Sequence, residues 1–255
     1  MTGKYSSYVA VGDSFTEGVG DPAPTGRRPR GWADQFARAA SRGNPDFAYA
    51  NLAIRGRLFD AVVDEQIPPT MRQNPDLVSF AAGGNDALRP SFHPQRLATR
   101  LHEVVRLLKA SNAEVVLFTS ADVTYHLPGT SLMRKRFGAM NDMIRTVADR
   151  HDAILVDLWP DEAFRNPVFW SEDRLHLSTK GHIQVATRVC EALDIEPIPE
   201  WSESLEPAES AAEAASKLQW ARKHLGPWVK RRLTGQSSGD SLDPKRPELS
   251  PVSDS

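Results

Sequence analysis

The sequence predicts an α/β protein in which helices cover both faces of a parallel sheet. Short runs rich in β-branched and aromatic residues alternate, up to about residue 193, with segments whose apolar residues recur at helical spacing. Each helical segment is long enough to return the chain across a sheet, which indicates right-handed βαβ units and a three-layer α/β/α sandwich. The expected strands are residues 5–11, 47–53, 76–82, 115–118 and 153–158.

The first helices follow directly from the apolar spacing. The first strand leads into a Gly-Asp-Ser turn, and residues 32–42 then carry apolar side chains three or four positions apart. A second helix begins near residue 58. We expect it to end at Pro68-Pro69, because proline lacks the amide hydrogen that a helix needs.

The alternation continues to about residue 193. Residues 97–108 carry Leu and Val at positions i, i+4, i+7, i+8 and i+11, the strongest helical pattern in the chain. A long amphipathic helix at 132–150 and a closing helix at 178–193 complete the expected domain. In sheets of this kind, ligands bind at the carboxyl ends of the strands.

The chain changes character beyond the α/β domain, which we expect to cover residues 1–194. Residues 195–208 are rich in Pro and Glu and are interpreted as a linker or strap. Residues 209–234 predict a helical extension, rich in Ala and basic residues and divided by a Gly-Pro pair. Residues 235–255 are dominated by Gly, Ser and Pro, with little to bury, which predicts a disordered tail.

Composition excludes several classes of protein. The 255 residues include 31 Lys+Arg and 33 Asp+Glu, a formal net charge of -2, so no global field favours nucleic acid or an anionic membrane. The single cysteine excludes an internal disulfide and a thiolate-rich metal site. No run approaches the roughly 20 apolar residues that span a bilayer. With no long apolar signal segment either, we expect a cytoplasmic protein without stable membrane insertion.

Polar residues follow three of the predicted strands and therefore share one edge of the sheet. Ser14 follows the first strand, Asn85 follows paired glycines after the third, and Asp173 and His176 follow the fifth. Taken singly, the first two motifs favour an ordinary turn, and the Asp-His pair is as consistent with the protein surface as with a site. Together they supply a nucleophile, a base, a group that orients the base and an amide donor, which acyl transfer requires.

Other residues near these motifs argue against two further kinds of site. Gly18 and Gly20 lack the Gly-Lys-Ser/Thr of a phosphate-binding loop. Gly-x-Ser-x-Gly occurs at residues 235–239, within the expected tail, and none follows a predicted strand as a nucleophile elbow would, which argues against an α/β-hydrolase. His182, inside the closing helix, is expected to be structural.

The motifs resemble those of the SGNH hydrolases, also called the GDSL-like lipase/acylhydrolase family. They are Gly12-Asp13-Ser14 for the first block, with Phe15 where Leu often stands, residues 51–56 (NLAIRG) for the second, Gly83-x-Asn85-Asp86 for the third and Asp173-x-x-His176 for the fifth. The blocks occur in the family's order between residue 5 and about residue 193.

The resemblance implies a five-stranded, flavodoxin-like parallel sheet in the order 2-1-3-4-5 and no metal or organic cofactor. It implies that Ser14 is the nucleophile, that His176 is the general base and acid, and that Asp173 orients this histidine. The oxyanion hole would consist of the backbone amides of Ser14 and Gly56 and the side chain of Asn85.

We therefore expect a serine esterase or acylhydrolase acting on a small-molecule or lipid-like ester. A carbohydrate deacetylase or a lysophospholipase would use the same residues, so these alternatives stay open. Arginines near the expected site, above all Arg89 and Arg174, favour an anionic substrate unless nearby aspartates pair with them. The alternative of another class is a non-catalytic interaction protein that acts through the basic residues and tryptophans of 209–234.

Overall fold

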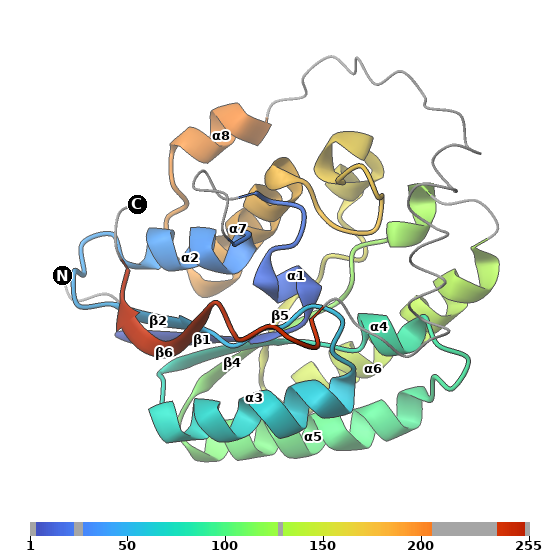
Figure 1. Cartoon of the computed structure of the whole chain (residues 1–255), viewed down its shortest axis with the longest axis horizontal. Coiled ribbons are helices and arrows are strands. Elements are labelled where there is room, and N and C mark those ends of the chain that lie inside the picture. The colour runs from blue at the N-terminus through green and yellow to red at the C-terminus, as the bar shows by residue number, and fades with distance from the viewer. Residues whose placement is uncertain (1–3, 23–27, 127–129, 206–238, 253–255) are drawn as a thin grey trace.

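A mainly parallel sheet forms the centre of the protein (Figure 1). The structure is a computed structural model, and it describes residues 4–22, 28–126, 130–205 and 239–252. The sheet has six strands in the order β5-β4-β3-β1-β2-β6. The parallel strands are β1 (Ser7–Gly12), β2 (Ala48–Asn51), β3 (Leu77–Ala81), β4 (Glu114–Phe118) and β5 (Ile154–Val156). These strands have the predicted order 2-1-3-4-5.

Helices cover both faces of the sheet, which confirms the three-layer sandwich (Figure 1). One layer holds α3 (Phe59–Gln73), α5 (Pro94–Ala110) and α6 (Ser131–His151). The other holds α2 (Trp32–Ala40) and α7 (Thr179–Leu193), which pack against each other. Short 3-10 helices occur at η1 (Val123–His126), η2 (Glu162–Arg165) and η3 (Pro167–Phe169). Among the described residues, no helix is long and apolar enough to cross a membrane.

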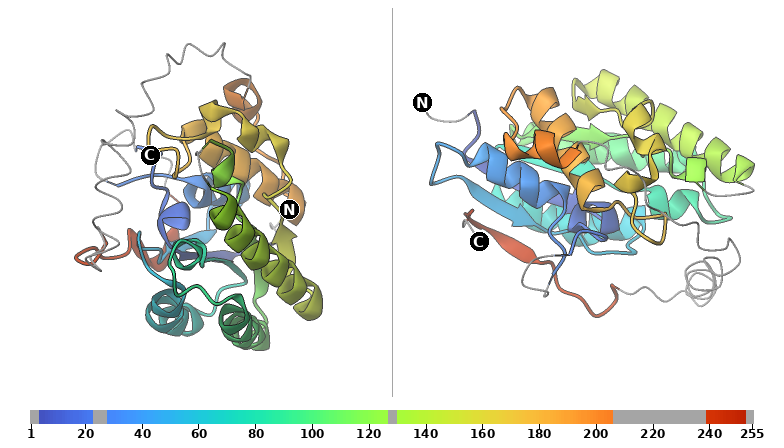
Figure 2. Two further views of the ribbon diagram at one scale, coloured as in Figure 1. Left: turned by 90° about the vertical axis from the view of Figure 1, so that its right-hand side faces the viewer. Right: turned by 90° about the horizontal axis from the view of Figure 1, so that it is seen from above.

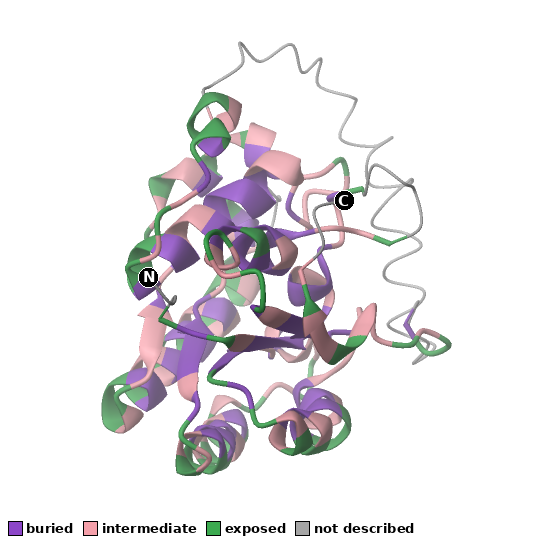
Figure 3. Cartoon of the chain, turned by 90° about the vertical axis from the view of Figure 1, so that its left-hand side faces the viewer, coloured by how far each residue is buried: buried purple, intermediate pink, exposed green. Residues whose placement is uncertain are grey.

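The core lies between the layers, on both faces of the strands (Figure 3). Val9, Ala10 and Val11 of β1 are each fully buried although successive side chains point to opposite faces. A strand with apolar residues on both faces needs a helical layer on each side, so its continuous apolar run is typical of a central parallel strand.

The prediction that α3 ends at Pro68-Pro69 is wrong, because the helix contains both prolines and continues to Gln73. Apolar residues before the prolines and Thr70 after them lie on one buried face, so packing holds the helix together across the interruption. The carbonyl groups that the prolines leave without a helical partner belong to Asp64 and Glu65. Both residues are exposed, so water can reach these groups.

The sheet has one strand more than the five expected, and the expectation of a disordered tail at 235–255 is wrong for residues 246–251. Part of that tail forms β6 (Arg246–Pro251), which pairs antiparallel with β2 at the edge of the sheet (Figure 2). Both side-chain contacts and backbone pairing hold β6 in place. Arg246 donates from Nε to the carbonyl of Tyr49 at 2.8 Å, and Gln73 accepts the Leu249 amide at 2.7 Å.

The expected linker at 195–208 is not irregular throughout. It contains α8 (Glu200–Leu205), because Trp201 inserts into the core with only 4% of its surface exposed. The helical extension expected at 209–234 lies outside the described residues.

Candidate active site

The carboxyl ends of β1 and β3 each lead into a short helix that positions one polar residue of the site. After β1, α1 (Ser14–Glu17) starts at Ser14, and the Asp13 carboxylate caps it by accepting the Phe15 amide at 3.1 Å. After β3, α4 (Gly84–Ala87) carries Asn85. Gly83 precedes this helix with φ +110°, a left-handed conformation that favours glycine. Neither short helix was predicted from the sequence.

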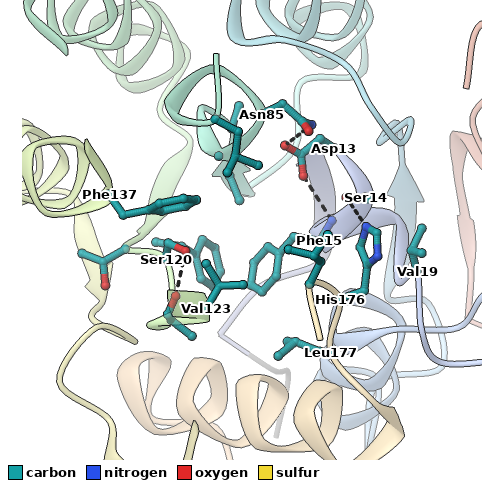
Figure 4. Close-up of a pocket in the computed structure, with 18 of the residues that line it drawn as sticks. Asp13, Ser14, Phe15, Val19, Asn85, Ser120, Val123, Phe137, His176 and Leu177 are labelled. Carbon is teal, nitrogen blue, oxygen red and sulfur yellow. Dashed lines mark hydrogen bonds between the residues drawn. The ribbon is translucent and has the colours of Figure 1, made fainter. Parts of the chain in front are cut away.

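Ser14, His176 and Asp173 form one chain of hydrogen bonds, and Figure 4 shows the contact between Ser14 and His176. The Ser14 Oγ lies 3.2 Å from His176 Nε2, and His176 Nδ1 lies 2.6 Å from Asp173 Oδ2. These residues are far apart in the sequence, and the sheet topology brings them together at its carboxyl edge. The arrangement can deprotonate the serine, because the carboxylate holds Nδ1–H and leaves Nε2 facing the hydroxyl.

The loop around Asp173 fixes its carboxylate. Its Oδ1 accepts the backbone amides of Leu175 and His176, each at 2.9 Å, and the Ser171 hydroxyl at 2.7 Å. Burial alone would raise the pKa of Asp173, but the hydrogen bond and positive charge of His176 and the two amides lower it below its ordinary value. Asp173 is therefore ionised at neutral pH and can stabilise an imidazolium.

Asn85 faces the site from the opposite side. Its Nδ2 donates to Asp13 Oδ2 at 3.1 Å and to the carbonyl of Arg57 at 3.0 Å. Gly56 lies in the turn after β2 with φ +78°. The residues on both sides of Gly56 contact the site elements, because Arg57 accepts from Asn85 while the Arg55 amide donates to Glu17 Oε2 of α1 at 2.7 Å.

A mainly apolar cavity of about 160 Å³ opens beside Ser14 and His176 (Figure 4). Its apolar lining comprises Phe15, Val19, Ala81, Ala82, Leu88, Phe118, Ala121, Val123, Phe137, Met140, Ile144, Trp170, Leu175 and Leu177. The sequence did not predict this lining. In α6 the only available signal was helical apolar spacing, and the same spacing also marks ordinary core.

Several arginines near the candidate site are paired with carboxylates. Arg30 lies 3.2 Å from Asp21, and Arg55 pairs with Glu17. Arg89 and Arg174, proposed from the sequence as substrate contacts, do not line the cavity. The Arg89 Nε is buried and donates to no partner among the described residues, while Arg174 adopts a left-handed conformation with φ +56° inside the Asp173–His176 loop.

His182 also borders the cavity, but its ring is fully used by the fold. Its Nδ1 accepts the Trp32 amide and its Nε2 donates to the Val19 carbonyl, both at 3.2 Å. Burial lowers the pKa of His182 to about 4, so the ring is neutral at physiological pH. The histidine is structural, as the sequence predicted.

The pKa of the Asp13 carboxyl group can be tested through the pH dependence of the unfolding free energy. Burial raises its pKa from 3.8 to about 6, although the Phe15 amide, His176 and Asn85 oppose the rise. A raised pKa contributes stability below about pH 4 that is lost as pH rises through about 6. Relative to wild type, Asp13→Asn should therefore gain about 2 kcal/mol of unfolding free energy between pH 4 and pH 7, since one pKa unit is worth about 1.4 kcal/mol.

Chemical denaturation at both pH values measures this difference. Asp76→Asn is the control: burial alone would raise the pKa of Asp76, but hydrogen bonds from Ser6 and Ser7 lower it, so Asp76 titrates below this pH range and its difference should change little. A pH-independent difference for Asp13→Asn would contradict the raised pKa.

This fold, with a serine, a histidine and an aspartate in hydrogen-bond contact at the carboxyl edge of the sheet, is the arrangement of an SGNH-type hydrolase. Residues 10–183 match the model of the GDSL-like lipase/acylhydrolase family, and the chain belongs to that family. Membership supports hydrolysis of an ester bond. Comparison with curated proteins gives no match.

Solved structures show the same fold. A catalytic mutant of Axe2, an acetylxylan esterase from Geobacillus stearothermophilus, is 18% identical with a TM-score of 0.62, over 78% of this chain and 98% of that one. LAE5, an alpha/beta hydrolase enzyme from the metagenome of Lake Arreo, Spain, is 22% identical with a TM-score of 0.61, over 76% and 97%. TesA is 21% identical with a TM-score of 0.58, over 73% and 97%. At such identities the likeness concerns the fold alone.

Proposed function

We propose that this protein is a serine-dependent esterase or acylhydrolase that cleaves carboxylic esters through an acyl-enzyme on Ser14. The observation that carries the proposal is the chain of hydrogen bonds from Ser14 through His176 to Asp173, which borders an apolar cavity. Among the described residues, no cluster of His, Cys, Asp or Glu could hold a metal ion.

In this mechanism His176 Nε2 removes the proton of Ser14 while Oγ attacks the ester carbonyl. Asp173 holds the resulting imidazolium in place. The negative oxygen of the tetrahedral intermediate is stabilised by the amides of Ser14 and Gly56 and by the Asn85 side chain. His176 then protonates the leaving alcohol, and water repeats the same steps on the acyl-enzyme.

The local structure supports the proposed oxyanion hole. Ser14 is the first residue of α1, a position where backbone amides have no acceptor within the helix. Asn85 is held in one orientation by hydrogen bonds to Asp13 and Arg57, and because these use both Nδ2 hydrogens, the oxyanion has to replace or share one of these acceptors. Donors held in advance stabilise the developing charge without reorganising during the reaction.

The cavity favours an ester with an apolar acyl group over a sugar-bound acetyl group. Aromatic and aliphatic side chains surround it, and burying apolar surface against them contributes about 25 cal/mol per Å². An acetyl group would leave most of this surface without contact. Arg89 and Arg174 lie outside the lining, so they do not contribute to the preference of this cavity for an acyl chain.

A panel of nitrophenyl esters with acyl chains from two to ten carbons tests the proposal. We expect kcat/KM to rise from acetyl to a longer acyl chain and then to fall once the cavity is filled. Labelling by a fluorophosphonate probe should modify wild type at Ser14. A folded protein that neither reacts with the probe nor hydrolyses any ester would favour the non-catalytic interaction protein.

Asn85→Ala tests the oxyanion assignment separately. Loss of one preorganised donor typically lowers kcat ~10²–10³-fold, about 2.7–4 kcal/mol, with little change in ground-state binding. Steady-state kinetics on one ester measures both constants. An unchanged kcat with a raised KM would instead assign Asn85 to substrate binding.

A further inference from the structure

Residues 239–252, here called the C-terminal strap, reach the candidate active site although they lie far from it in sequence. Their second half is β6, at the edge of the sheet. Their first half contacts the loops that surround α1 and Gly56. The contacts of this first half involve the backbone of those loops.

Lys245 is the central anchor of the C-terminal strap. Its side chain is only 6% exposed, and its ammonium group pairs with Asp34. It also donates to the carbonyls of Glu17 at 2.7 Å, of Pro29 at 3.0 Å, and of Arg30. A buried ammonium needs such acceptors to offset the loss of water. Lys245 thereby joins the end of α1 to the loop that precedes α2.

Two further residues of the strap contact the turn that contains Gly56. Asp240 Oδ1 lies 3.1 Å from the Arg57 guanidinium. Gly239 lies so close to the turn that a Cβ atom there would collide with the carbonyl oxygen of Arg55. The strap thus touches the residue on each side of Gly56.

Glu17 connects these two sets of contacts. Its backbone carbonyl accepts from Lys245, while its buried carboxylate accepts the Arg55 amide at 2.7 Å and pairs with the Arg55 guanidinium. A displacement of Lys245 is therefore transmitted to α1, which starts at Ser14, and through Glu17 to the turn at Gly56. Arg57, on the other side of that turn, holds Asn85.

We propose that the C-terminal strap positions the oxyanion hole, with Lys245 as its main positioning residue. The inference rests on the proposed esterase function. Docking of the strap sets the separation of the Ser14 amide, the Gly56 amide and Asn85, and hence kcat. No residue of the strap lines the cavity that binds substrate, and most of the lining lies outside α1.

Full-length Lys245→Met and Gly239→Val test this role. Methionine keeps the length of the side chain without its charge, and valine collides with the Arg55 carbonyl. We expect each to lower kcat by up to about 100-fold, as misplacement of reacting groups by about 1 Å can do. KM should change little. Active-site titration with a fluorophosphonate corrects for any inactive fraction.

Gln73→Ala is the matched control. Gln73 holds only the far end of the strap, through the Leu249 amide and the Pro247 carbonyl. It should lower the melting temperature without lowering kcat. If Lys245→Met and Gly239→Val likewise lose melting temperature but keep kcat at a temperature where they are folded, the strap is merely stabilising and the proposal is overturned.

Asp240→Asn covers the case in which the buried variants do not fold, because the Asp240 side chain is 55% exposed. It should lower kcat by a smaller factor, whereas Glu65→Gln, which removes the other carboxylate of Arg57, should not. Equal kcat values in both variants would overturn the role of Asp240.

Hydrogen exchange at residues 54–57 separates failure of this proposal from failure of the proposed function. Lys245→Met should speed exchange there even if wild type hydrolyses no ester. Unchanged exchange in the folded variant would overturn the coupling between Lys245 and the turn, whatever the activity of the enzyme.

Discussion

Ser14→Ala is expected to lower ester turnover by about 10⁶-fold, the loss found when the nucleophile of a serine hydrolase is removed. The Ser14 hydroxyl contacts His176 Nε2 at 3.2 Å, and no other side chain among the described residues offers His176 a nucleophile at that position. The change should shift unfolding free energy by no more than about 0.5 kcal/mol, because the serine contributes a reacting atom rather than packing. Kinetics on the best ester, together with thermal melting, measures both effects.

Ser120→Ala is the matched control for this variant. Ser120 lines the same cavity, but its hydroxyl donates to the Ala121 carbonyl and makes no contact with His176. It should retain activity close to that of wild type. If Ser14→Ala kept wild-type turnover, Ser14 would not be the nucleophile and the proposed mechanism would be wrong.

His176→Ala should be almost as damaging as Ser14→Ala. Without the imidazole, Ser14 loses the base that accepts its proton, and the leaving alcohol loses its acid. The Ser14→Ala/His176→Ala double variant should be no worse than either single variant, because a nucleophile and its base act as a unit and their effects do not add.

The rate of fluorophosphonate labelling provides a second measurement on His176→Ala, because it reports the reactivity of Ser14 without substrate turnover. We expect labelling to slow sharply. A double variant much less active than both single variants would show that Ser14 and His176 act independently, contrary to their hydrogen bond.

Most of the fold could be predicted because the buried parallel strands carry continuous apolar runs and the helices between them carry regular apolar spacing. The order of the five parallel strands came from a family resemblance rather than from periodicity. The end of α3 was mispredicted because tertiary packing around Thr70 outweighs the local effect of two prolines. Local rules of helix formation contain no information about that packing.

The polar residues of the candidate site could be predicted because they follow strands at one edge of the sheet. The ion-pair and hydrogen-bond partners around the site could not be predicted. The pairing of Arg55 with Glu17, and the burial of Lys245 against three carbonyls, depend on residues distant in sequence. Likewise, the Pro- and Ser-rich sequence of β6 has no strand-like pattern, because backbone pairing with β2 and the contacts of Lys245 and Arg246 hold it in place.

The position of β6 also bears on how the protein avoids self-association. An unpaired strand edge is a template on which another chain can add a strand, and β2 would offer such an edge if β6 were displaced. In β6 itself, Pro247 and Pro251 have no amide hydrogen to donate, and Glu248 is charged and exposed. At the opposite edge, β5 is only three residues long. Proteolytic removal of the carboxy terminus would therefore expose the edge of β2 to intermolecular β-pairing. We expect a protein that has lost β6 in this way to aggregate.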